Sequence, residues 1–248
     1  MRLDILGAGP AYSDRLDSSG AAYLVRQGGH AVLLDLGQGS FPRLAQALEP
    51  SRLDAVVVSH LHPDHFIDLV PLRHYLRWEF EPTRRLRVIA PATIGERLDA
   101  LLAEPGFTGA TFDVEILLPG VQAIGTFELE ARRVVHAQDS FGFRLSASQG
   151  PGLVYSGDCG RAEDLDALVR AGDTLLCEVS FGPGPVPVDA LHLDGPAVGA
   201  LAARTQAGRV LLTHLQMGFD REATVTSVRA RFDGPVDFVV PGDRFAIG

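Results

Sequence analysis

The stretch Ala55-Val56-Val57-Val58-Ser59-His60-Leu61-His62-Pro63-Asp64-His65 places three imidazoles and a carboxylate directly after a short apolar run. An uninterrupted apolar run of this length is typical of a strand that is buried on both faces. Imidazole nitrogen and carboxylate oxygen are ligands of zinc and similar divalent metals. The stretch therefore predicts a buried strand that ends at a metal site, with enough ligands for two ions.

The spacing within this motif predicts how its ligands divide. His60 and His62 are two residues apart, so on an extended segment both rings point to the same side and can reach one ion. Pro63 favours an extended conformation at His62. Asp64 and His65 lie where the next helix begins, from which they would point to a second ion. The alternative is a run of helix-capping and surface polar residues, and this density of histidine disfavours it.

Further ligand-type side chains follow other apolar runs, where sites assemble in layered α/β folds. His136 and His214 come directly after such runs, and His192 precedes a helix. Asp158 follows Gly157, and its two carboxylate oxygens could bridge two ions; the alternative is a cap on the following helix. Asp35 could orient a ligand histidine, and a turn or cap role is equally open.

The apolar patterns predict strands and helices that are mixed along the chain, with no linker or repeat. One layered α/β domain over residues 1–248 would accommodate them. Expected strands are 3–6, 21–26, 31–36, 55–59, 86–89, 112–117, 127–135, 142–146, 153–156, 175–178, 210–213 and 236–240, and expected helices are 41–48, 65–78, 94–103, 162–170, 197–204 and 221–231.

Composition narrows the class of protein. The formal net charge is −9, from 22 basic and 31 acidic residues, which argues against a broad nucleic-acid surface. The two cysteines form no CxxC motif and imply no disulfide framework. No apolar run approaches the roughly 20 residues that span a bilayer, and no cleavage-type signal pattern is present. We therefore expect a cytoplasmic protein with no membrane partner.

The motif His60-x-His62-x-Asp64-His65, followed in order by His136, Asp158 and His214, resembles the metallo-β-lactamase superfamily over nearly the whole chain. The resemblance implies a four-layer αββα sandwich with metals at one edge between two sheets. It also implies an ion on His60, His62 and His136, a second ion on Asp64, His65 and His214, and Asp158 with a water or hydroxide as bridges.

Within that superfamily, three stretches are similar to the ribonuclease Z-like phosphodiesterase branch: 141–144, 176–181 and 190–194. The resemblance implies that Glu178 pairs with His192, which donates a proton to the leaving oxygen. A phosphodiester's alkoxide leaving group needs that proton, and histidine titrates near neutral pH. The stretch 182–187 is short and uncharged, however, so the long basic insertion with which ribonuclease Z grips transfer RNA has no counterpart.

These observations predict a dinuclear metal-dependent hydrolase, in which metal-bound hydroxide attacks a small phosphodiester and Asp64, Glu178 and His192 are catalytic. Zn²⁺ is the expected metal, with Mn²⁺ or iron as alternatives, and the chain is expected to form a homodimer. A lactonase or thioester hydrolase, RNA processing of the ribonuclease Z type, and a non-hydrolytic iron protein stay open. Three arginines are candidates for binding a second phosphate or another acidic group: Arg73, Arg77 and Arg144. The alternative is that they are solvated surface charges.

Overall fold

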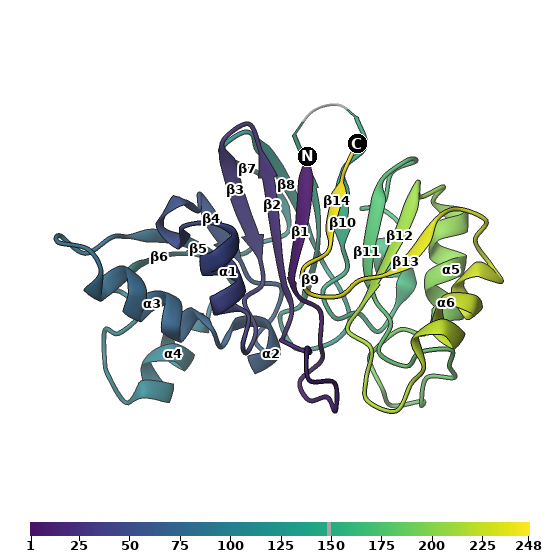
Figure 1. The fold of residues 1–248 in the computed structure, drawn as a ribbon, viewed down its shortest axis with the longest axis horizontal. Helices are drawn as coiled ribbons and strands as arrows, with labels where there is room; N and C mark the ends of the chain where they lie inside the picture. Colours follow the sequence, from purple (N-terminus) through teal and green to yellow (C-terminus); the bar gives the residue numbers. More distant parts are fainter. Residues whose placement is uncertain (148–149) are drawn as a thin grey trace.

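Two seven-stranded β-sheets pack face to face and carry helices on both outer faces (Figure 1), in a computed structural model that describes residues 1–147 and 150–248. The first sheet runs in the order β14 (Arg244–Ala246), β1 (Arg2–Gly7), β2 (Ala22–Gln27), β3 (His30–Leu34), β4 (Ala55–Val57), β5 (Leu86–Ala90) and β6 (Phe112–Ile116). The second runs β13 (Val236–Phe238), β12 (Arg209–Thr213), β11 (Thr174–Glu178), β10 (Leu153–Tyr155), β9 (Phe141–Ser146), β8 (Phe127–Arg133) and β7 (Gly120–Ile124).

The helices form the two outer layers. Those of the first half, which cover the first sheet, are α1 (Phe41–Ala47), α2 (Pro63–Phe66), α3 (Leu69–Trp78) and α4 (Ile94–Leu102). Those of the second half, which cover the second sheet, are α5 (Gly195–Arg204) and α6 (Arg221–Arg229). The expected αββα sandwich is confirmed.

Side chains that alternate between the two faces of each strand form the core between these layers. In β2, Tyr23 and Val25 belong to the core between the two sheets, whereas Ala22 and Leu24 belong to the core under the helices. Successive side chains of a strand point to opposite faces, so a sheet covered on both sides needs apolar residues at both. This explains the uninterrupted apolar runs, which end at the sheet edge where the polar residues begin.

Two expected helices differ in the structure. The segment 162–170 forms only a short 3₁₀ turn at Ala162–Leu165, and beyond it the Arg170 N–H donates to the carboxylate of Asp173 and not to a helical carbonyl. The segment 65–78 divides into α2 and α3 at Asp68, whose backbone N–H donates to Leu36 and whose carboxylate accepts from the Phe41 N–H. The edge strands β7 and β14 were not expected, since their few residues carry little apolar pattern.

Two of the three arginines that were candidates for phosphate binding are buried, and their guanidinium groups bond other protein groups. Arg144 lies in β9 and makes a two-point ion pair with Asp173 at 2.7 and 2.9 Å. Arg73 packs over the Phe107 ring and bonds Glu104. These side chains are therefore neither solvated surface charges nor free donors to a phosphate.

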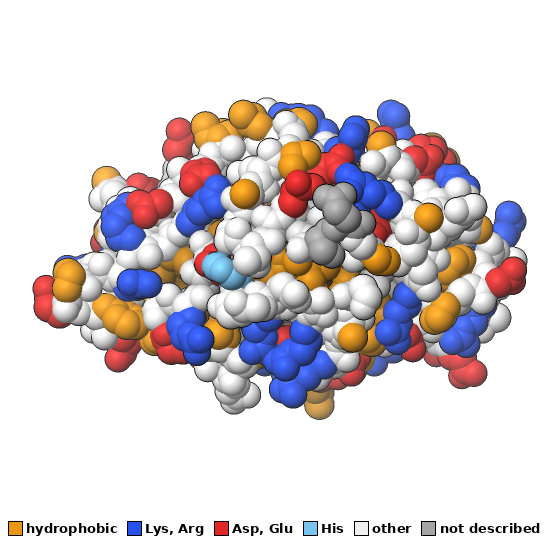
Figure 2. Space-filling model, turned by 90° about the horizontal axis from the view of Figure 1, so that it is seen from above, with side chains coloured by type: hydrophobic (Ala, Val, Ile, Leu, Met, Phe, Trp, Pro, Cys, Tyr) orange, Lys and Arg blue, Asp and Glu red, His pale blue; other side chains and the backbone are white. Residues whose placement is uncertain are grey.

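The surface that carries both chain termini mixes charges of both signs, and basic side chains lie beside acidic ones over most of it (Figure 2). Near the termini, the carboxylate of Asp4 accepts hydrogen bonds from Arg2 and Arg26 and forms an ion pair with Arg244. Among the described residues, no helix is long and apolar enough to cross a membrane.

The buried pair of Arg144 and Asp173 yields a stability prediction. Replacing Asp173 by Ala leaves a buried guanidinium without its partner, and we expect the free energy of unfolding to fall by about 3–5 kcal/mol. The matched change Asp166→Ala breaks the exposed pair with Arg204 and should cost less than about 1 kcal/mol. Urea unfolding measures both values, and equal losses would contradict the assignment of Arg144 to the core.

Candidate metal centre

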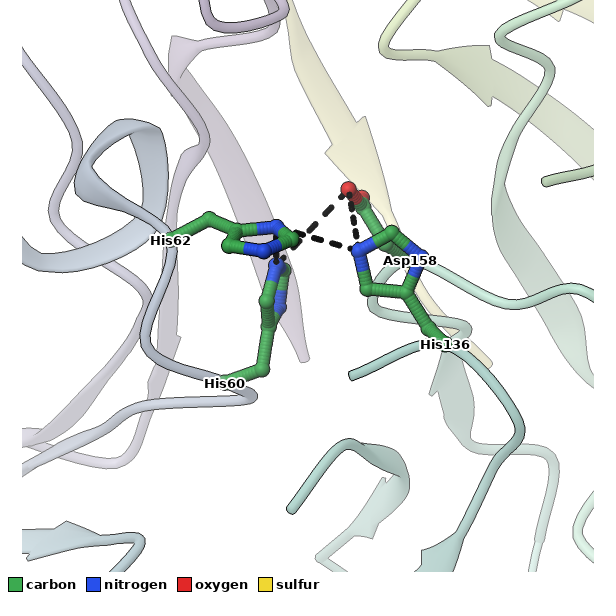
Figure 3. A group of neighbouring side chains, drawn as sticks. All are labelled: His60, His62, His136 and Asp158. Atoms are coloured by element: carbon green, nitrogen blue, oxygen red, sulfur yellow. Dashed lines mark hydrogen bonds and ion pairs between the residues drawn. The ribbon is translucent and has the colours of Figure 1, made fainter. Parts of the chain in front are cut away.

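The predicted ligands converge at one edge of the sandwich, where loops from both sheets meet. His60 and His62 follow β4 of the first sheet. His136 follows β8, Asp158 follows β10 and His214 follows β12 of the second sheet. In the first group, side chains up to 98 positions apart in the sequence therefore face one another, as the close-up shows (Figure 3).

The first group consists of His60, His62, His136 and Asp158 (Figure 3). His62 Nδ1 lies 3.0 Å from His60 Nε2 and 3.1 Å from His136 Nε2. Asp158 Oδ2 lies 3.7 Å from His60 Nε2 and 3.6 Å from His136 Nε2. Donor atoms around a tetrahedral zinc ion with bonds of 2.0–2.1 Å are separated by about 3.3 Å. The group therefore has the spacing that one such ion requires.

The second group consists of Asp64, His65 and His214, and Asp158 adjoins it. His214 Nε2 lies 3.1 Å from Asp64 Oδ2 and 3.3 Å from His65 Nε2. Asp158 Oδ1 lies 3.3 Å from His65 Nε2 and 3.5 Å from His214 Nε2. The two oxygens of this carboxylate thus face different groups, which is the arrangement that a bridging ligand needs.

The donor set fits divalent cations. Asp158 Oδ1 is buried and has no hydrogen-bond partner within the described chain, and a buried acceptor without a partner is costly. Ring nitrogens of five histidines face this carboxylate or one another at 3.0–3.7 Å. A cation supplies the charge that both kinds of donor lack, so the arrangement is explained by metal binding.

In His60, His65, His136 and His214, the ring nitrogen on the far side from the group is bonded to the protein, which fixes the tautomer and ring orientation. Asp35 carries the strongest of these contacts, since its Oδ2 accepts from His65 Nδ1 at 2.7 Å and from the Tyr155 hydroxyl at 2.7 Å. Asp35 therefore contacts a candidate ligand histidine, as the orienting role predicts. The other contacts are His60 Nδ1 with Ser59 Oγ at 3.1 Å, His136 Nδ1 with Leu191 O at 2.8 Å, and His214 Nδ1 with Ser180 Oγ at 3.1 Å.

Unusual backbone conformations deliver two of these side chains. Asp35 and His214 have φ values of 59° and 60°, a left-handed region that non-glycine residues seldom adopt and that clusters at functional sites. Gly157 has φ 57°, and a Cβ atom there would lie 2.6 Å from the carbonyl oxygen of Phe141. Only glycine permits this approach, which places Asp158 at the sheet edge.

Electrostatics divides the histidines into two classes. Burial, with the neighbouring imidazoles, lowers the pKa of His60, His62 and His136, so these rings are neutral and ready to bind a cation. Burial also acts to lower the pKa of His65 and His214, but the charge of Asp158, together with Asp35 at His65 and Asp64 at His214, raises the pKa of both. A cation that enters the second group therefore displaces protons from it.

Glu178 and His192 pair beside the ligands, as the family resemblance implies. His192 Nδ1 donates to Glu178 Oε1 at 2.9 Å, and Glu178 also accepts from the backbone of Cys159 and from Ser180. Burial acts to lower the pKa of His192, but the hydrogen bond and charge of Glu178 raise it above the usual value. His192 Nδ1 is also 4.0 Å from Asp158 Oδ2, so the pair adjoins both ligand groups.

Three other side chains of metal-ligand type, Cys159, His30 and His74, are not part of the two ligand groups. Burial raises the pKa of the Cys159 thiol, whose Sγ contacts the Arg161 carbonyl, so it is unsuited to bind metal. His30 bonds Asp54 and His74 is exposed on α3, so both histidines lie apart from the two ligand groups. Ser180, Tyr155 and Ser59 were not singled out as orienting residues, because a hydroxyl side chain carries no local sequence signal for that role and Tyr155 and Ser180 reach Asp35 and His214 only in the folded chain.

A family model of the beta-lactamase superfamily domain matches residues 30–215, a range that contains every ligand named above. The chain belongs to the metallo-β-lactamase superfamily. An uncharacterized protein of Mycobacterium leprae is 34% identical over 240 residues, which cover 93% of this chain and 84% of that protein. The predicted membership is confirmed.

Solved structures of this superfamily share the fold over the whole chain. YhfI of Bacillus subtilis, a metallo-beta-lactamase fold protein, is 21% identical with a TM-score of 0.88, covering 100% of this chain and 99% of its own. The short form of human tRNase Z is 20% identical with a TM-score of 0.76 and full coverage of both chains. A diphosphatase from the PhnP family is 15% identical with a TM-score of 0.77, covering 100% of this chain and 98% of its own.

The contact between Asp35 and His65 predicts the metal affinity of a variant. Asp35→Asn keeps the size of the side chain and the tolerance for a left-handed backbone, but removes the charge behind the ring. We expect metal affinity to fall by about 10-fold or more, measured by competition with a chromophoric chelator. The matched control Asp54→Asn alters the carboxylate that bonds His30 and should leave affinity unchanged. Equal affinities for Asp35→Asn and the wild type would contradict the orienting role.

Proposed function

We propose that the protein is a hydrolase that uses two divalent metal ions, with Zn²⁺ the first choice, to cleave a small phosphodiester. The observation that carries this proposal is Asp158, whose two oxygens face two separate ligand groups. The ligands would be His60, His62 and His136 for one ion and Asp64, His65 and His214 for the other, bridged by Asp158. Two neighbouring structures carry names of enzymes that act on phosphate compounds, a diphosphatase and a tRNase.

When bound, such a metal pair lowers the pKa of water and offsets the charge that develops on the phosphoryl oxygens. The chain's own residues would orient the water and protonate the leaving group. Asp64 lies against His214 in the second group, where its carboxylate can also orient the attacking water through a hydrogen bond. His192 keeps its Nδ1 proton on Glu178, so that Nε2 is the atom that delivers a proton to the leaving oxygen.

The pair of Glu178 and His192 favours a phosphodiester over a carbonyl substrate. The alkoxide that leaves a phosphodiester is a strong base, and its departure gains most from a protonated histidine. The raised pKa of His192 keeps that proton available near neutral pH. A lactone or thioester has less need of such a donor, so those reactions stay the alternatives.

RNA processing is less well supported than a small substrate. The segment 182–187 is uncharged, and the whole chain carries a net charge of −9. A protein that binds many phosphates needs a basic surface to replace their counterions. A homodimer that widens the binding surface is part of the proposal, and light scattering of purified protein tests it.

The function is tested by a substrate screen with zinc and manganese supplied separately. We expect turnover of phosphodiesters such as bis(p-nitrophenyl) phosphate and of dinucleotides, and its loss after complete removal of metal. Faster hydrolysis of a lactone or thioester panel would replace the phosphodiesterase proposal with its alternative. Full activity after exhaustive chelation would overturn metal-dependent chemistry altogether.

A leaving-group comparison predicts the role of His192. In His192→Ala, cleavage of a dinucleotide should fall by about 10²–10⁴-fold, because its alkoxide departs unprotonated. Cleavage of bis(p-nitrophenyl) phosphate should fall far less, because nitrophenolate is a stable anion that needs no proton. Steady-state kinetics on both substrates measures the difference.

The control variant is His74→Ala, which removes an exposed histidine on α3 that bonds the Val70 carbonyl of its own helix. It should change neither rate. Metal content of both variants should match the wild type. An equal loss on both substrates in His192→Ala would mean that the residue is not the proton donor.

A further inference from the structure

A pocket of about 130 Å³ adjoins the first ligand group. Its polar lining residues are His62, Thr93, Arg97, Gln138 and Asp139. They come from the metal-binding stretch, from the start of α4 and from the loop that follows His136. A molecule held at the first group therefore lies beside this pocket and can extend a substituent into it.

Arg97 is the cation of this pocket. Its Nη1 donates to the carbonyl oxygen of Leu61 at 3.0 Å, and Leu61 lies between the ligands His60 and His62. This bond fastens the guanidinium against the metal-binding stretch and occupies one of its five N–H donors. The donors that remain form the fork that matches a phosphate or carboxylate.

The charge of Arg97 is not neutralised within the pocket. No ion pair of Arg97 is found in the described residues 1–147 and 150–248. Asp139, the acidic residue of the lining, bonds instead to Arg133 Nη1 at 2.5 Å. In a chain with a net charge of −9, such a cation beside the metal ligands offers local attraction to an anion that the protein as a whole repels.

We propose that this pocket binds a second phosphate group of the substrate, next to the phosphodiester that is cleaved, with Arg97 as its ligand. This inference rests on the proposed phosphodiesterase function and narrows it to substrates that carry a further anionic group. Arg73, Arg77 and Arg144 were candidates for this role from the sequence. Two of these are buried in internal pairs, and Arg77 bonds Thr83.

The kinetic test uses two substrates that share their reacting group: thymidine 5′-(p-nitrophenyl phosphate) and the same compound with a 3′-phosphate. We expect the wild type to prefer the 3′-phosphorylated substrate. Because Arg97→Gln removes the charge-assisted hydrogen bonds to the 3′-phosphate, it should reduce that preference by about 10-fold or more, mainly through KM. Arg97→Lys keeps the charge but not the fork and should fall in between.

The control variant is Arg84→Gln, which removes an exposed arginine at the opposite end of β5 from the pocket. It changes the net charge by the same amount and should leave the preference unaltered. A purely structural role for Arg97, through its bond to Leu61, would lower the rates with both substrates equally. That result would overturn the proposal.

A binding measurement separates this inference from the proposed function. Calorimetric titration of the zinc-loaded protein with thymidine 3′,5′-bisphosphate and thymidine 5′-monophosphate should show a tighter bisphosphate complex. Arg97→Gln should weaken that complex selectively, by about 10-fold or more. If the wild type cleaves neither substrate but this selectivity is seen, the phosphodiesterase proposal fails and the anion pocket stands. Equal weakening of both ligands would refute the pocket, whatever the activity.

Discussion

The site depends on one carboxylate that faces two groups of imidazoles. Asp158 is almost fully buried, yet one of its oxygens has no hydrogen-bond donor within the described chain. Burial alone would raise the pKa of this carboxyl, but the charges of His214 and His65 outweigh burial and hold it well below its usual value. A buried anion of this kind requires cations, and the ligand spacing on either side of it provides for them.

Two further carboxylates, Asp35 and Glu178, contact residues of the site from outside the two ligand groups. Asp35 bonds His65, Ser59 and Tyr155 and so connects both sheets beneath the centre. Glu178 bonds His192 directly, and it accepts from the hydroxyl of Ser180, which in turn accepts from His214. One buried carboxylate thus orients both the proposed proton donor and a metal ligand, so the acid and the metals keep a fixed relation.

The parts of the site that the sequence predicted are those with a local signal. The spacing of the motif 60–65 predicts which of its side chains point to the same ion. The strands before His136, Asp158 and His214 predict that these residues lie at the sheet edge. Orienting and anion-binding residues such as Ser180 and Arg97 carry no such signal, because their partners are brought near only by the packed fold. The pairing of Arg144 with Asp173 could not be predicted for the same reason, because it depends on how strands and loops of the second sheet pack.

The position of the centre between the two halves also links metal binding to the fold. Asp64 and His65 come from the first half, and Asp158 and His214 come from loops of the second sheet. An ion that binds all of them holds both sheets at this edge, and it does so only in the folded chain, so its binding free energy adds to stability. Without it, the charge of Asp158 raises the pKa of His65 and His214, which favours protons on these rings in place of the cation. The same edge therefore serves folding and chemistry, which accounts for the strained backbone tolerated at Asp35 and His214.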